Sequence, residues 1–150
     1  MEEFAIRKEV EIDATPDQVW PYIGTGTGLG KWFGNATVSM EEKDGGHYEE
    51  RGSFDNSPYV IAGRVVTIQP PRKLILECRV ETSPESTWPV YTTMTFTLEK
   101  VNGGTKVTLV HSGFEKLPEA YRENMHTGFT YGWGSSFPRL AEVVQHELVR

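Results

Sequence analysis

Residues 118–149, PEAYRENMHTGFTYGWGSSFPRLAEVVQHELV, predict one long helix with an apolar face. Apolar residues recur there at steps of three and four, which places them on one side of a helix and leaves charged residues on the other sides. The apolar positions are Trp133, Phe137, Leu140, Ala141, Val144 and Leu148. We expect this face to pack across another element of the chain.

The first half of this segment contains residues that are unfavourable inside a helix. Gly128, Gly132 and Gly134 each cost about 1 kcal/mol relative to alanine. Pro138 removes one backbone donor and crowds the preceding turn, so we expect a kink near residues 134–138. The glycines alternate with aromatic residues, and two interpretations remain open: a close approach of the backbone to a sheet or ligand, or a frayed helix start.

The chain before this helix is dominated by the alternation typical of strands with one buried face. Such segments span residues 4–12, 37–40, 46–54, 59–68, 73–80, 90–100 and 105–112. Because no helical pattern separates the last six, we predict an antiparallel meander. Residues 15–18, Thr-Pro-Asp-Gln, form a capping box that starts a short helix after the first strand.

The segment GTGTGLGK at residues 24–31 is rich in glycine but matches no nucleotide-binding motif. A phosphate-binding loop would require Gly where Thr25 stands and Ser or Thr where Trp32 stands. The dinucleotide pattern fails because Leu29 occupies the position of its third glycine. We expect a flexible loop ahead of Trp32 and Phe33, of the kind that can gate a cavity.

Composition excludes several classes of function. The 150 residues fit one domain, 1–150, and the net charge of −6 argues against non-specific binding of nucleic acid. We expect no membrane insertion, because no apolar run approaches the ~20 residues needed to cross a bilayer. The single cysteine and an amino terminus without an apolar signal region indicate a cytoplasmic protein. The four histidines are scattered, so we expect no metal site, and no cofactor is implied.

Two polar residues fall on strand faces that should point inward, Glu50 beside Tyr48 and His111 beside Leu109. A buried polar group costs about 1 to 3 kcal/mol unless it finds a partner, so each should meet a protein group or a ligand. Both are candidates for catalysis, although His111 can equally be a hydrogen-bonded structural histidine and Glu50 can point to solvent. The face of Arg64 stays open, because its strand is apolar on both sides.

Several separated motifs resemble the START-like superfamily, in its branch named for the activator of the heat-shock-protein-90 ATPase. The motifs are TPDQVW at residues 15–20, Trp32, GGHY at 45–48, GRV at 63–65, IQPPRKL at 68–74, GGTKVTLVHSGF at 103–114, Gly132-Trp133 and Arg139-Leu140. They occur in order through nearly the whole chain. The chain departs from the pattern in its glycine-rich segment, at Glu50, where an apolar residue is usual, and in the glycine-rich approach to Trp133.

The resemblance implies an α+β helix-grip fold: a curved antiparallel sheet of about seven strands wrapped around the C-terminal helix, with two short helices after the first strand. It also implies a cavity for a hydrophobic or aromatic small molecule. The residues expected to line it are Trp32, Tyr48, Glu50, Cys78, Met94, Phe96, His111, Phe129, Trp133 and Phe137, for which the alternative is ordinary core. Other functions left open are a cyclase-like or dehydratase-like enzyme and a chaperone-interacting domain. A homodimer is an open alternative to a monomer.

Overall fold

A computed structural model describes residues 4–34, 36–54, 56–82 and 87–149 of the chain. Within these ranges the strands form one antiparallel sheet of seven, in the order β1-β7-β6-β5-β4-β3-β2. The strands are β1 (Ile6–Ile12), β2 (Thr37–Met40), β3 (His47–Phe54), β4 (Ser57–Gln69), β5 (Lys73–Val80), β6 (Thr92–Val101) and β7 (Gly104–Ser112). The helices are α1 (Pro16–Val19), η2 (Trp20–Tyr22), α2 (Gly26–Gly30), η3 (Phe114–Lys116) and α3 (Glu119–Leu148).

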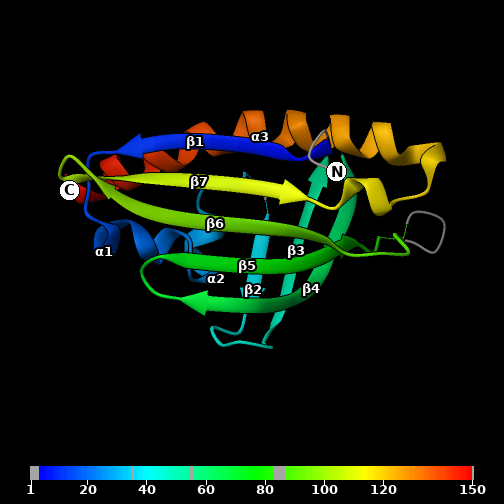
Figure 1. Ribbon diagram of the computed structural model, residues 1–150, viewed down its shortest axis with the longest axis horizontal. Coiled ribbons are helices and arrows are strands. Elements are labelled where there is room, and N and C mark those ends of the chain that lie inside the picture. The colour runs from blue at the N-terminus through cyan, green and yellow to red at the C-terminus, as the bar shows by residue number, and fades with distance from the viewer. Residues whose placement is uncertain (1–3, 35, 55, 83–86, 150) are drawn as a thin grey trace.

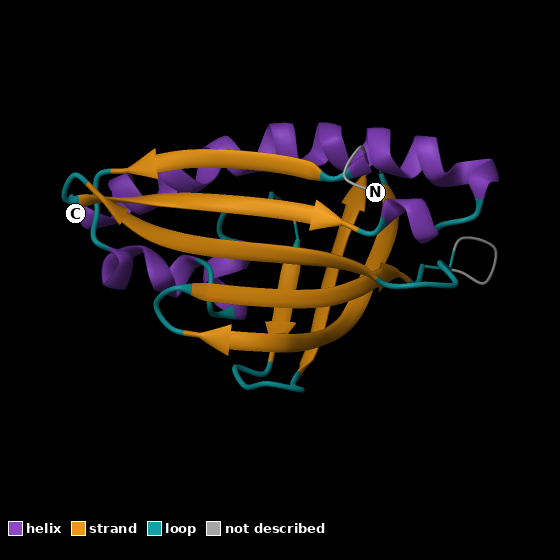
Figure 2. Cartoon of the chain, in the orientation of Figure 1, coloured by secondary structure: helices purple, strands orange, loops and turns teal. Residues whose placement is uncertain are grey.

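The sheet is strongly curved. Strands β1, β7, β6 and β5 run along the long axis of the molecule, whereas β3 and β2 cross it steeply (Figure 1). Helix α3 runs lengthwise along the molecule beside β1 (Figure 2). The short helices α1, η2 and α2 lie near its C-terminal end, whereas η3 lies near its N-terminal end (Figure 2). The predicted α+β helix-grip architecture is therefore confirmed.

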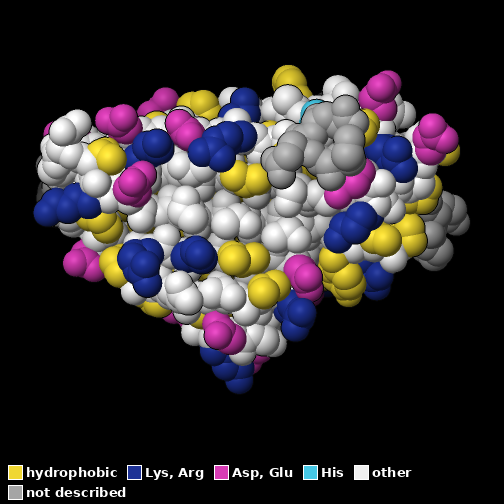
Figure 3. Space-filling model, viewed as in Figure 1, with side chains coloured by type: hydrophobic (Ala, Val, Ile, Leu, Met, Phe, Trp, Pro, Cys, Tyr) yellow, Lys and Arg dark blue, Asp and Glu magenta, His cyan; other side chains and the backbone are white. Residues whose placement is uncertain are grey.

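The inner face of the sheet carries the apolar sets that the alternation predicted. Met94, Phe96 and Leu98 on β6 are at most 6 % exposed, and Val107 and Leu109 on β7 are fully buried. The residues between them point outward, and on that outer side Figure 3 shows Lys and Arg interspersed with Asp and Glu. One face of the sheet thus builds the core and the other meets solvent.

The long helix spans Glu119–Leu148, close to the predicted bounds, and its helical assignment continues through Pro138. Trp133, Phe137, Leu140 and Val144 are buried, as the apolar pattern predicted. Leu148 was also expected on the buried face but is 40 % exposed. It lies in the last turn of the helix, where less of the protein covers it. None of the described helices is both long and apolar enough to cross a membrane.

The glycine-rich segment is not the flexible loop that the sequence suggested. It forms the short helix α2, whose N-cap Thr25 accepts a hydrogen bond from the backbone N–H of Gly28. A Cβ atom at Gly28 would lie 1.8 Å from the carbonyl oxygen of Pro21, and one at Gly26 would lie 2.6 Å from that of Val38. The glycines therefore allow α2 to pack tightly against η2 and β2.

Candidate ligand-binding cavity

A cavity of about 570 Å³ opens between the sheet and residues 124–139 of α3. Its sheet side and the adjoining loop contribute Phe33, Gly34, Glu50, Ser53, Tyr59, Ile61, Val80 and Met94. Its helix side contributes Asn124, Met125, Gly128, Phe129, Tyr131, Gly132, Trp133, Ser135, Ser136 and Arg139. The volume lies within the range of about 300–1,000 Å³ that is usual for sites binding small organic molecules.

Glycine makes room for this cavity on the helix side. Gly128 and Gly132 are four residues apart, so they lie on the same face of α3. A Cβ atom at either position would have no described neighbour within 4 Å. The helix is formed here, so its start is not frayed, and its backbone does not press against the sheet; a close approach of the backbone to a ligand stays a prediction. The glycines leave open space instead.

An aromatic cluster forms one wall and the core behind it. Phe33 and Trp133 line the cavity, with their ring centroids 5.6 Å apart and their planes nearly perpendicular. Trp32, Phe96 and Phe137 stand behind them, each making edge-to-face contacts in the same cluster. Such packing fixes the orientation of the two rings that face the cavity.

The carboxyl group of Glu50 is held between two phenols. Tyr48 donates a hydrogen bond to Oε1 over 3.0 Å, and Tyr59 donates one to Oε2 over 2.7 Å. Glu50 is 7 % exposed, and burial raises the pKa of its carboxyl group, while the hydrogen bonds from Tyr59 and Tyr48 act in the opposite direction. Burial, together with the Glu50 charge, also raises the pKa values of both phenols.

Arg64 does not neutralise the charge of the Glu50 carboxylate. Ile61 and Val65 take the inward positions of β4, whereas Arg64 is exposed, with its Nε atom 3.1 Å from Oε1 of Glu77. Among the described residues, no Lys, Arg or His side chain forms an ion pair with Glu50. Burial therefore dominates the protonation behaviour of Glu50.

His111 is a satisfied core histidine that lies outside the cavity wall. Trp133 donates its indole N–H to Nδ1 over 3.0 Å, so the ring proton is on Nε2, which lies 2.9 Å from the Thr92 hydroxyl. That hydroxyl in turn donates to the carbonyl oxygen of Cys78 over 3.3 Å. Burial, reinforced by His126, lowers the pKa of His111 to about 3, so the imidazole is neutral near pH 7.

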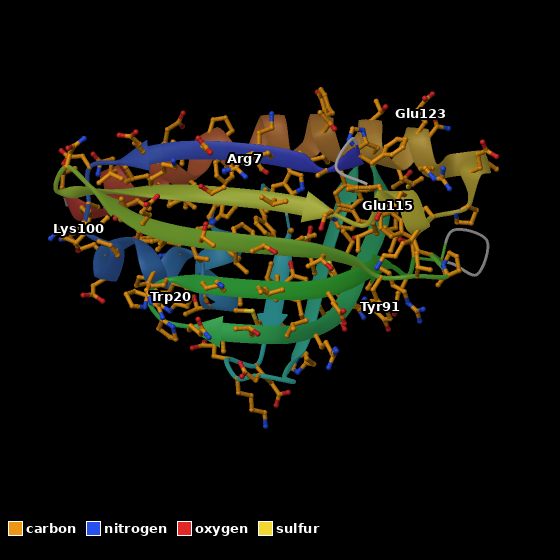
Figure 4. The ribbon with its side chains drawn as sticks, viewed as in Figure 1. Arg7, Trp20, Tyr91, Lys100, Glu115 and Glu123 are labelled. Carbon is orange, nitrogen blue, oxygen red and sulfur yellow. The ribbon has the colours of Figure 1, made fainter. Side chains whose placement is uncertain are left out.

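The structure brings only part of the expected set together. Glu50, Met94, Phe129 and Trp133 line the cavity. The others are buried outside its wall: Trp32, Tyr48, Cys78, Phe96, His111 and Phe137. Alternation along a strand identifies the inward face, but the cavity occupies only the part of that face beneath residues 124–139 of α3, which follow Glu123, labelled in Figure 4.

Tyr59 is the functionally suggestive residue that the sequence analysis missed. It lines the cavity and binds Glu50, yet the ambiguous alternation of its strand gave no face to its neighbours. Its spacing of two from Ile61 would have placed it on the inner face once Ile61 was assigned inward. Arg139 and Tyr131 on α3 were also missed, since both lie off the main apolar stripe of the helix.

Metal ligation finds no support in the side-chain arrangement. Within the described residues, no group of three or more His, Cys, Asp or Glu side chains is placed to hold a metal ion. Cys78 is buried, with Sγ 4.0 Å from the Met94 sulfur, and burial raises the pKa of its thiol. Such a thiol is a poor nucleophile, because the reactive species is the thiolate.

Solved structures with the same fold come from several bacteria. The protein Ms6760 of Mycobacterium smegmatis superposes with a TM-score of 0.76 at 16 % identity, covering 95 % of this chain and 91 % of its own. The Aha1 dimer from Colwellia psychrerythraea gives 0.68 at 18 % identity, covering 93 % and 95 %. DynU16, from the dynemicin biosynthetic locus, gives 0.68 at 19 % identity, covering 95 % of this chain and 48 % of its own. A comparison with curated protein sequences gives no match.

The curved sheet that grips a C-terminal helix over a cavity defines a START-like domain. Within that superfamily the match is specific. Residues 13–145 match the sequence profile of the Activator of Hsp90 ATPase homolog 1-like proteins, and the chain belongs to this family.

Proposed function

We propose that residues 1–150 form one ligand-binding domain that holds a hydrophobic or aromatic small molecule between the sheet and α3. The observation that carries this proposal is the cavity of about 570 Å³, with mostly apolar walls and one paired carboxyl group. Sites for small organic molecules combine apolar walls with a few fixed polar groups in this way.

Filling the cavity with a side chain tests the proposal. A solvatochromic apolar dye, Nile red, should bind the wild type and lose at least tenfold in affinity in Gly132→Leu, because the new side chain occupies the open space beside the helix. Gly134→Leu is the matched control, since Gly134 lies in the same helix but not in the cavity wall. Equal dye binding by both variants would contradict the proposal.

An enzymatic role in the same cavity is the second candidate. A carboxyl group with a raised pKa inside an apolar cavity is a recurrent feature of acid–base catalysis, and Glu50 meets that description. The structural similarity to DynU16, a protein of a biosynthetic locus, also supports an enzymatic role. Turnover of a cyclisable polyketone by the wild type but not by Glu50→Gln would favour this role over simple carriage.

Two further assignments rest on relatives alone. The family description concerns an activator of a chaperone ATPase, and one structural neighbour is a dimer. Chaperone contact and homodimerisation of this chain therefore remain proposals. Light scattering coupled to gel filtration measures the second directly, and a mass of one chain, 16.9 kDa, at high micromolar concentration would contradict it.

A further inference from the structure

The number of protons in the Tyr48–Glu50–Tyr59 triad determines what the cavity can offer to a ligand. The triad contains two hydrogen bonds, one from each phenol to a separate carboxylate oxygen. When Glu50 is ionised, its three groups carry two protons, and both are used in these bonds. When Glu50 is protonated, they carry three, so one donor is left without an acceptor inside the triad.

The surplus O–H donor is placed more favourably on Tyr59 than on Tyr48. Tyr48 is 1 % exposed, so an unpaired O–H on its side of the triad would be buried without a partner, which costs about 1 to 3 kcal/mol. Tyr59 is only partly buried and lines the cavity. If the Glu50 proton on Oε2 is donated to the Tyr59 oxygen, the phenol O–H is released to face the cavity.

The remaining titratable groups around this triad do not compete for the role. Cys78 approaches from β5 with a buried thiol, and α3 contributes Tyr131 and Arg139 to the same cavity. Arg139 is the cation among these groups; it is exposed and forms no ion pair with Glu50. Protonation of Glu50 therefore responds mainly to its burial and to what enters the cavity.

We propose that the cavity selects apolar aromatic ligands that carry a carbonyl oxygen, that this oxygen accepts a hydrogen bond from the Tyr59 hydroxyl, and that Glu50 takes up a proton from solvent as such a ligand binds. The inference rests on the proposed ligand-binding function and names the chemistry of its ligand. A ligand without an acceptor gains nothing from the surplus donor, so its binding should be independent of the protonation of Glu50.

A matched pair of probes isolates the carbonyl. Fluorene and 9-fluorenone share one tricyclic skeleton and neither titrates. Measured by displacement of Nile red, 9-fluorenone should bind about tenfold more tightly than fluorene at pH 5.5. Its advantage should decrease as the pH rises through the titration of Glu50, by at most tenfold per pH unit. Calorimetry in phosphate and Tris buffers, which differ in ionisation enthalpy, should show uptake of up to one proton for 9-fluorenone.

Three variants assign the effects to individual groups. Tyr59→Phe removes the donor and should make the two probes bind equally. Tyr48→Phe is the matched control: it removes the other phenol, leaves the Tyr59–Glu50 pair and should preserve the preference for the carbonyl. Glu50→Gln cannot ionise, so it should keep that preference and lose its dependence on pH.

Equal affinities of fluorene and 9-fluorenone for the wild type would overturn the inference while leaving the proposed function intact. An unchanged preference in Tyr59→Phe, or a pH dependence that persists in Glu50→Gln, would also overturn it. Failure of both probes and of the dye to bind the cavity would instead contradict the proposed function itself. Circular dichroism of each variant establishes that the comparison is made between folded proteins.

Discussion

Glu50 and His111 are both buried polar side chains, and burial moves their pKa values in opposite directions. Removal from water disfavours the charged form of each group. For Glu50 this raises the pKa of the carboxyl group, and for His111 it lowers that of the imidazole to about 3. Both residues are therefore neutral over a wider range of pH than in an unfolded chain, and their contributions to stability have opposite slopes.

Glu50→Gln should become increasingly stabilising, relative to the wild type, as the pH rises above about 4.5. Between the unfolded and the raised folded pKa, the folded state holds a proton that the unfolded state has lost, so wild-type stability falls with rising pH. The difference should grow by at most about 1.4 kcal/mol per pH unit. Urea unfolding of both proteins from pH 4 to 8 measures it, and a constant difference would contradict the assignment.

His111 should destabilise the protein in acid. Below pH 6.5 His111 binds a proton in the unfolded chain, whereas in the folded protein it stays neutral down to about pH 3. The free energy of unfolding therefore falls as the pH decreases from 6.5 to 3. The maximum slope is about 1.4 kcal/mol per pH unit. His111→Gln, which cannot titrate, should lose less stability than the wild type between pH 6.5 and 4. Parallel curves for the two proteins would mean that folding does not lower the pKa of His111.

Replacing His111 by phenylalanine should damage the fold rather than a ligand contact. The variant leaves the Trp133 N–H without an acceptor and the Thr92 hydroxyl without one of its partners, at about 1 to 3 kcal/mol for each buried group left unpaired. Denaturant unfolding should show this loss. A variant as stable as the wild type but unable to bind Nile red would instead show that His111 contacts the ligand.

Helix α3 consists of two halves with different packing. From Trp133 onward it carries four buried apolar side chains, which complete the core against the sheet. Among the described side chains before Trp133, none in this helix is fully buried, and Met125 and Phe129 are partly buried. Most of the α3 residues that line the cavity lie in this first half, so the apolar side chains there have fewer packing partners than those after Trp133.

Gly128→Ala and Gly132→Ala should each stabilise the protein and weaken binding of Nile red. Alanine favours a helix over glycine by about 1 kcal/mol, and apart from the adjacent residues and the backbone of the helix itself no described atom lies within 4 Å of the added methyl group. The same methyl group narrows the cavity. Gly134→Ala should give the stability without the loss of affinity, because Gly134 is outside the wall. Equal dye affinity in all three variants would show that the glycines do not serve the cavity.

Sequence patterns predicted the helices and strands more completely than they predicted the residues that line the cavity. Strict alternation placed Met94 and Phe96 correctly, and a capping box located the start of α1. The same rules misread α2, because glycine repeats favour a loop locally, while the tight contact of Gly28 with Pro21 is a tertiary feature. The cavity depends on how far α3 stands from the sheet, which no pattern within one segment encodes.

At the scale of the whole molecule, the curvature of the sheet creates the cavity. Strands β3 and β2 cross the long axis of the molecule steeply (Figure 1), and the cavity lies between Glu50 and Ser53 of β3 on one side and residues 124–139 of α3 on the other. The resulting space is partly closed by the rings of Phe33 and Trp133 and by the sheet itself. A ligand in this position would supply the contacts that the first half of α3 lacks.

Ligand binding should therefore slow amide hydrogen exchange by different factors along α3. At a free concentration of 100 times Kd, a ligand adds about 2.7 kcal/mol to the free energy of unfolding, and every amide that exchanges by global unfolding slows accordingly. In the free protein the backbone amides of residues 124–132 should exchange their hydrogens by local opening of the helix, because few buried side chains pack this half of α3 against the core. With 9-fluorenone bound, their exchange should slow by a larger factor than that of residues 140–148. The Gly132→Leu variant, whose own side chain fills the cavity, should show this protection without ligand and change little when the ligand is added. Equal slowing in both halves of α3 would place the ligand elsewhere on the molecule.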